Sequence, residues 1–143
     1  MAIINPIIGH EITVQIGDGA SPEVFAHPVL INTTRAVSFT TATESDELCD
    51  TEDQSLPAQT FRRVRSFDTK IDGAGMLHKA SVHEFLSWAG SGEVKNVKVA
   101  IGDSIVTGPF VLTSFQVSAE RVKTSECQIT LEQAGPVTVT EAP

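Results

Sequence analysis

Apolar and polar residues alternate along most of this chain, which is the pattern of half-buried β-strands. Residues 11–16 (EITVQI) alternate in this way and end at a Gly-Asp-Gly turn signal. Residues 29–41 are rich in β-branched side chains, and the alternation in residues 61–72 leaves one strongly charged face. The pattern resumes after residue 93 and continues to residue 132. The chain is therefore predicted to consist mainly of β-strands.

One segment departs from the β pattern, residues 81–89 (SVHEFLSWA). Ser81 and Glu84 stand three positions apart as a capping box, and Gly90 follows as a stop signal. The spacing predicts one short helix whose single apolar stripe packs on the sheet, with Trp88 at the edge of that stripe. The predicted stripe consists of Val82, Phe85, Leu86 and Ala89.

The order of elements predicts a mainly β fold, an antiparallel β-sandwich or small barrel with one short flanking α-helix. Residues 1–143 fit a single domain. Within it, residues 1–26 form an N-terminal segment that is hard to assign, since Pro22 and Pro28 disfavour a long hairpin there. Turns or breaks are predicted at 17–19, 102–104, 108–109 and 120–125, and a C-terminal tail at 136–143.

Residues 42–60 show no usable apolar periodicity and are acidic, without one basic residue. They predict a long loop, and loops beyond about 12–15 residues are usually binding segments or disordered. Arginines follow at once, and this separation of charge favours contacts in which the acidic segment of one copy lies on the arginines of the next. The predicted subunit interface comprises Glu44, Asp46, Glu47, Asp50, Glu52, Asp53, Arg62, Arg63 and Arg65.

Simpler interpretations of these charges remain open. The acidic segment also suits a solvated loop, and arginines often guard an exposed edge strand. Oxygen-rich loops bind calcium, but this segment has neither the central Gly nor the alternate spacing of an EF-hand loop. Four scattered histidines and the lack of a Gly-x-Ser-x-Gly elbow predict no catalytic residue, and the sequence indicates no metal or cofactor.

The amino-acid composition argues against further classes of function. The net charge of −8 argues against binding to a nucleic-acid backbone, which needs clustered Lys and Arg. The N-terminus lacks the positive region of a secretory signal, and no apolar run approaches the roughly 18 residues of a membrane span. We therefore expect a soluble protein that stays in the cytoplasm where it is made. Cys49 and Cys127 are expected to be free thiols.

Two stretches in the C-terminal half, GPFVLTSF at 108–115 and ECQITLEQAG at 126–135, resemble the major tail tube proteins of long-tailed phages and phage-derived particles. A long loop followed by an arginine-bearing strand ending in IDG at 71–73 agrees with that family. The resemblance implies a structural virion protein that forms six-fold rings, stacked head to tail around a channel for DNA. It also implies a loop that reaches a neighbouring subunit, partners at the tail tip or baseplate and at the terminator, and assembly in the host cytoplasm.

A channel that conducts DNA gains from acidic walls, because a basic wall would bind the phosphates. The polar alternates of two predicted strands are therefore candidates for the lumen, although any half-exposed antiparallel sheet shows such alternation. These candidates are Asp68, Asp72, Glu126, Gln128, Thr130 and Glu132. The alternative function is a monomeric β-sandwich module that binds carbohydrate or a protein. Against carbohydrate, the chain has no Tyr and its one Trp lies on the predicted helix.

Overall fold

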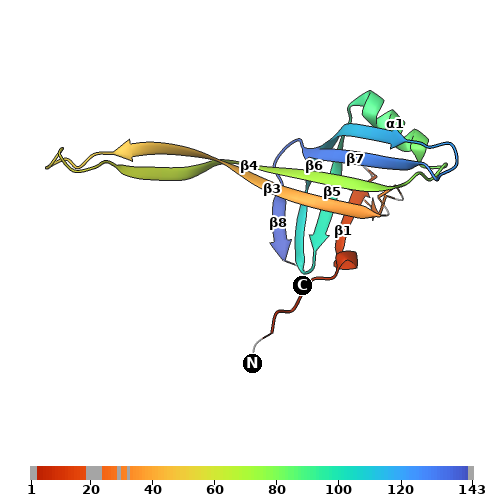
Figure 1. Ribbon diagram of the computed structural model, residues 1–143, viewed down its shortest axis with the longest axis horizontal. Coiled ribbons are helices and arrows are strands. Elements are labelled where there is room, and N and C mark those ends of the chain that lie inside the picture. The colour runs from red at the N-terminus through yellow and green to blue at the C-terminus, as the bar shows by residue number, and fades with distance from the viewer. Residues whose placement is uncertain (1–2, 19–23, 29, 32, 142–143) are drawn as a thin grey trace.

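The computed structural model describes residues 3–18, 24–28, 30–31 and 33–141, and Figure 1 shows their arrangement. A 3-10 turn (Gly9–Glu11) precedes the first strand, and one helix, α1 (Val82–Ser91), interrupts the strands. The strands are β1 (Ile12–Gly17), β2 (Phe25–Ala26), β3 (Thr34–Leu48), β4 (Gln59–Met76), β5 (Val94–Ile101), β6 (Ser104–Ser118), β7 (Glu126–Gln133) and β8 (Thr138–Glu141). The predicted class, a mainly antiparallel β fold with one short helix, is confirmed.

The strands form one antiparallel sheet in the order β2-β1-β5-β6-β7-β4-β3, and β8 pairs with β6 outside this path. The long β6 joins two layers, because its first half pairs with β5 and β8 and its second half with β7. The register of β6 against β7 shifts between Leu112 and Ser114, a bulge of the kind that bends a strand. In Figure 1, β1 and β8 accordingly run across the direction of β3 and β4.

The core lies between these layers and under α1. Alternate residues of the strands around the core point inward, as the sequence pattern predicts. Ile71, Val99 and Leu131 are fully buried. Gly73 is required where it stands, because a Cβ there would lie 2.8 Å from the side chain of Ile31. The largest fully buried side chains are Phe110, Leu30, Ile31, Ile71, Ile129 and Leu131.

The helix is present, but its details differ from the prediction. Ser81 makes no side-chain cap, and the helix ends at Gly92, which adopts φ 68° and donates its N–H to the Trp88 carbonyl. Trp88 is buried rather than at the edge, because its indole N–H donates to the Glu93 carbonyl at 2.8 Å. Leu86 is 54% exposed, and Ala89 is exposed too. The buried face is thus rotated towards Trp88.

Three predictions about connections are wrong. The loop predicted at 42–60 is shorter than expected, since residues 42–48 belong to β3, residues 59–60 belong to β4, and only 49–58 connect the two strands. Gly108 and Pro109 lie inside β6, where Gly108 lets the chain pass so closely that a Cβ would lie 2.9 Å from the Val137 Cα. The C-terminal tail contains β8, because residues 138–141 pair with the start of β6.

The predicted turns at 102–104 and 120–125 are confirmed, each joining two antiparallel strands. The turn predicted at 17–19 extends beyond the described residues at Gly19. Pro22, and Val29 and Asn32 of the strand predicted at 29–41, likewise lie outside them.

Candidate assembly surfaces

The outer part of the β3–β4 hairpin, residues 42–66, is called the arm here, and Figure 1 shows it projecting far beyond the rest of the protein. Every residue of the arm is exposed. Its apolar side chains are included, since Phe61 is 50%, Val64 61% and Leu48 55% exposed. The arm therefore keeps a regular backbone ladder while presenting both of its faces to the surroundings.

The register of the arm divides the arginines that the sequence predicts as one cluster. Arg63 pairs across the ladder with Glu44, and their side chains form an ion pair at 3.4 Å. Arg62 lies opposite Ser45, so it points to the other face of the arm. Arg65 lies at the register shift, since Ala42 pairs with Ser66 and Thr43 with Val64. The arginines thus serve both faces of the arm, and one of them already has an acidic partner in its own chain.

The connection at the end of the arm, residues 49–58, is called the arm tip. Asp50 accepts hydrogen bonds from the backbone N–H groups of Glu52 at 2.8 Å and Asp53 at 3.0 Å. Asp53 in turn accepts from the Ser55 backbone N–H at 3.0 Å and the Ser55 hydroxyl at 2.6 Å. These bonds lower the pKa of both carboxyls from the ordinary value. The acidic residues of the arm tip therefore fix its backbone conformation and also give it a negative charge.

The predicted lumen residues share one surface, called the acidic face, which is the side of β4 and β7 turned away from the core. Asp72 pairs in register with Thr130, whose hydroxyl donates to the Asp72 carboxylate at 3.0 Å. Ile71 and Leu131, the next residues along, point into the core. On this side β4 and β7 carry four carboxylates and one base, Lys70. The face brings together Asp68, Asp72, Glu126, Gln128, Thr130 and Glu132.

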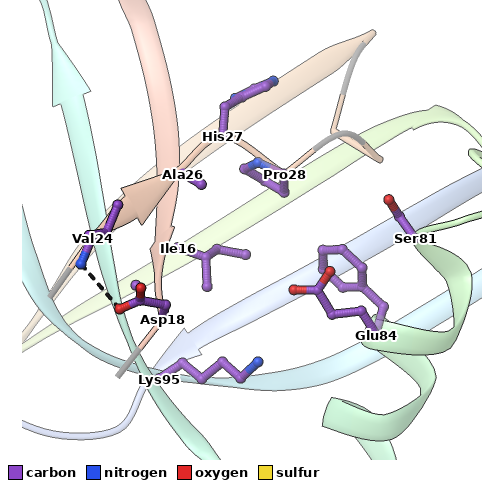
Figure 2. A pocket seen from close by; sticks show the side chains of 11 residues that line it. Ile16, Asp18, Val24, Ala26, His27, Pro28, Ser81, Glu84 and Lys95 are labelled. Atoms are coloured by element: carbon purple, nitrogen blue, oxygen red, sulfur yellow. Dashed lines mark hydrogen bonds between the residues drawn. The ribbon is translucent and has the colours of Figure 1, made fainter. Parts of the chain in front are cut away.

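A pocket of about 370 Å³ lies between β1, β2 and the start of α1. Figure 2 shows Glu84 and Lys95 reaching into it from different elements, and Asp18 accepting a hydrogen bond from the Val24 backbone N–H at 3.1 Å. The Lys95 ammonium also lies 5.0 Å from the centre of the Trp88 ring. Acidic and basic groups are mixed here, so the pocket favours no ligand of one charge. Its walls come from segments far apart in the chain, which is why sequence reasoning misses it.

The two cysteines are free thiols, as predicted. Cys49 is exposed in the arm tip, whereas Cys127 is buried in β7 and donates its thiol to the Leu30 carbonyl at 3.5 Å. Burial raises the pKa of the Cys127 thiol above its ordinary value. Within the described ranges, no three His, Cys, Asp or Glu side chains are grouped to hold a metal ion, and no helix has the length and apolarity to cross a membrane.

Comparison with known proteins gives one family and several structures. Residues 7–139 match the family model described as phage tail tube protein. The chain resembles the tail of a gene transfer agent particle with C6 symmetry (TM-score 0.71, 22% identity), covering 93% of this chain and 98% of that one. No curated protein matches in sequence.

Two other solved structures share the fold. The SPP1 tail tube has a TM-score of 0.60 and 13% identity, covering 95% of this chain and 80% of that one. The six-fold symmetrised baseplate of the anti-feeding prophage has a TM-score of 0.62 and 10% identity, covering 97% and 98%. At such identities, the likeness concerns the arrangement of the backbone.

Proposed function

The chain belongs to the phage tail tube protein family, and we propose that its copies close into six-membered rings that stack into a channel for DNA. As a member of that family it is a structural protein of the virion tail, and its family gives no reason to expect an enzyme. Six-fold symmetry is proposed because two of the similar structures are described with it. The observation that carries the proposal is the acidic face, since a closed ring needs one solvated sheet surface to line its hole.

The acidic face is proposed to line the lumen through Asp68, Asp72, Glu126, Gln128, Thr130 and Glu132. Its four carboxylates and one base leave it negative, so it repels phosphates instead of binding them. Its position on strands whose other side is buried in the core keeps these side chains fixed relative to the channel. A wall of this kind lets DNA pass without a specific contact.

The arm is proposed to lie on neighbouring subunits, with the interface residues Glu44, Asp46, Glu47, Asp50, Glu52, Asp53, Arg62, Arg63 and Arg65. Its exposed Phe61, Val64 and Leu48 supply apolar area for such a contact, at about 25 cal/mol per Å² removed from water. The Arg63–Glu44 pair does not oppose docking, because exposed pairs contribute only about 0–1 kcal/mol. Either member can exchange its partner for one on another copy.

The ends of such a tube need other proteins. We propose that the end rings contact tail tip or baseplate proteins at one end and a terminator protein at the other. The likeness to a protein in a baseplate structure supports the first of these contacts. We also propose that the tube is assembled in the host cytoplasm and resides in the virion tail. No catalytic step is assigned to the chain.

The alternative, a monomeric β-sandwich module that binds carbohydrate or a protein, has less support. Sugar-binding surfaces usually display exposed Trp or Tyr rings. Trp88 is only 3% exposed and packs under Lys95, and the chain has no Tyr. Among the described residues that line the pocket of Figure 2, the aromatic one is Phe85, which is only 4% exposed.

Negative-stain electron microscopy of the purified protein tests this proposal, across a series of protein and salt concentrations and alongside light scattering. Rings or hollow tubes are the expected result. Seeding with tail-tip complexes is expected to start tube growth where the protein alone stays monomeric. A protein that stays monomeric even when seeded would contradict the tube and favour the binding module.

A further inference from the structure

We propose that the turn between β6 and β7 is the docking surface for the arm tip of a second copy of this chain. This turn, residues 119–125, is called the basic turn, and Lys79 in the segment beside it extends its charge. The inference rests on the proposed function, because it names the partner surface for the arm of a tube subunit.

The basic turn is ordered and projects its charges outward. The Lys123 backbone N–H donates to the Glu120 carbonyl at 3.2 Å, which closes the turn, and the Leu77 N–H donates to the Ser125 carbonyl at 3.1 Å, which ties the turn to the segment before α1. Arg121 and Lys123 against Glu120 leave a charge of +1 (2 − 1). In the adjoining segments Lys79 adds one positive charge and the exposed Glu126 one negative charge, so the surface stays at +1. Between the two bases stands Val122, which is 89% exposed.

The arm tip has the complementary character. It carries Asp50, Glu52 and Asp53 with no base, a charge of −3, and the hydrogen bonds of Asp50 and Asp53 hold it in a fixed shape. Leu56 beside these acids is 50% exposed. Each surface therefore combines an exposed apolar side chain with a net charge, and the two net charges are opposite in sign.

The two surfaces lie at opposite ends of the protein. β4 begins at Gln59 beside the arm tip and ends at Met76, which pairs with Glu126, the first residue after the basic turn. At about 3.3 Å per residue, the 18 residues of β4 span about 60 Å. Figure 1 shows the arm and the β6–β7 connection at the two extremes of the long axis.

Complementary surfaces so far apart cannot meet within one chain. When each copy offers its tip to the turn of another, the contact is head to tail, and such contacts produce rings or stacked filaments. The arginines of the arm are poorer partners for the tip, because they are divided between the two faces of the arm. In the basic turn Arg121 and Lys123 lie two residues apart, and the exposed Lys123–Glu120 pair does not oppose docking.

Charge reversal tests the contact. Arg121→Glu should raise the protein concentration needed for tube growth about tenfold, since it removes an attraction and adds a repulsion. Glu52→Lys should raise this concentration by a similar factor. For the chain that carries both changes, the concentration needed for tube growth should lie within about threefold of the wild-type value. Lys70→Glu is the matched control, because it changes the net charge equally at an exposed position on the acidic face.

Cross-linking gives a second measurement that does not depend on assembly being weakened. Cys49 is exposed in the arm tip, so Val122→Cys in assembled tubes should be linked to Cys49 of another copy by a short bis-maleimide. Val139→Cys is the matched control, because Val139 is 62% exposed on β8. Cys49→Ser should abolish the links.

The outcomes separate the two proposals. Wild type that forms no tube under any condition would overturn the tube and, with it, this contact. Wild-type tubes whose growth is unchanged by Arg121→Glu, or in which Val122→Cys links no better than Val139→Cys, would overturn only the assignment of the basic turn. Retained growth of Lys70→Glu beside loss in Arg121→Glu, rescued by Glu52→Lys, would support it.

Discussion

The arm and the body, which is the rest of the sheet with α1, share the strands β3 and β4 but are stabilised differently. In the body, β4 buries Ile71 completely and covers Gly73 with Ile31. In the arm, the same strand continues its ladder with β3 while every side chain remains exposed. Backbone hydrogen bonds and one exposed ion pair therefore hold the arm together, whereas side-chain packing stabilises the body. Because two-stranded hairpins are at best marginally stable in water, the arm gains most from a surface supplied by another copy.

The largest expected effect separates the two regions along one strand. Ile71→Ala should lower the free energy of unfolding by about 2–5 kcal/mol, because it leaves a cavity between the layers. Val64→Ala, at an exposed position of the arm, should change it by less than about 0.5 kcal/mol. Urea denaturation of the unassembled protein measures both. Equal losses would show that the arm is packed as tightly as the body.

A smaller loss of stability is expected when a methyl group is added at Gly73, where the backbone lies close to Ile31. Gly73→Ala should cost about 1–3 kcal/mol, because its Cβ would lie 2.8 Å from Ile31. Gly90→Ala is the control, since nothing lies within 4 Å of a Cβ there and alanine favours the helix. Thermal unfolding should show a lower midpoint for the first variant and an unchanged or higher one for the second.

Reversing the charge of the arm arginines tests the role of the arm in assembly while leaving the core unchanged. The variant Arg62→Glu/Arg63→Glu/Arg65→Glu should lose about 1 kcal/mol or less of monomer stability, because the one ion pair it breaks is exposed. It should nevertheless fail to grow rings or tubes. Light scattering and circular dichroism on the same sample report the two properties. Normal tubes from this variant would remove the arm from the subunit interface.

The smallest effect concerns pH and the arm tip. The folded pKa values of Asp50 and Asp53 are lowered, so the stability they add is present above their unfolded pKa and is lost as the pH falls through the folded one. Acidification should therefore lower the hydrogen-exchange protection of the Glu52 and Ser55 amides, relative to the intrinsic rate at each pH, while the amides of the body remain protected. Asp50→Asn should weaken this response at Glu52. Exchange that rises in β7 at the same pH would contradict a local change.

The sequence pattern predicts a strand and its two sides where one side of the sheet is buried, because apolar and polar residues then alternate. Asp68, Asp72 and the polar residues of β7 alternate with Ile71, Ile129 and Leu131, so both sides of that part of the sheet can be assigned without coordinates. The strands of the arm have no buried side, so the alternation that marks a strand disappears although the ladder continues.

Other features depend on contacts between distant segments. Gly108 and Pro109 look like a break until Val137 is found crossing β6 at that point. The buried side of α1 is likewise fixed by the Trp88 bond to the Glu93 carbonyl, which helical spacing alone does not reveal. Such contacts are properties of the folded chain, so sequence patterns miss them.

Cryo-electron microscopy of tubes grown from the purified protein tests the central claim most directly. The account predicts that Asp72 and Gln128 face the lumen and that the arm of each subunit reaches another copy, with its tip on the basic turn. Tubes in which the acidic face lies on the outer surface, or in which the arms project freely into solvent, would contradict it.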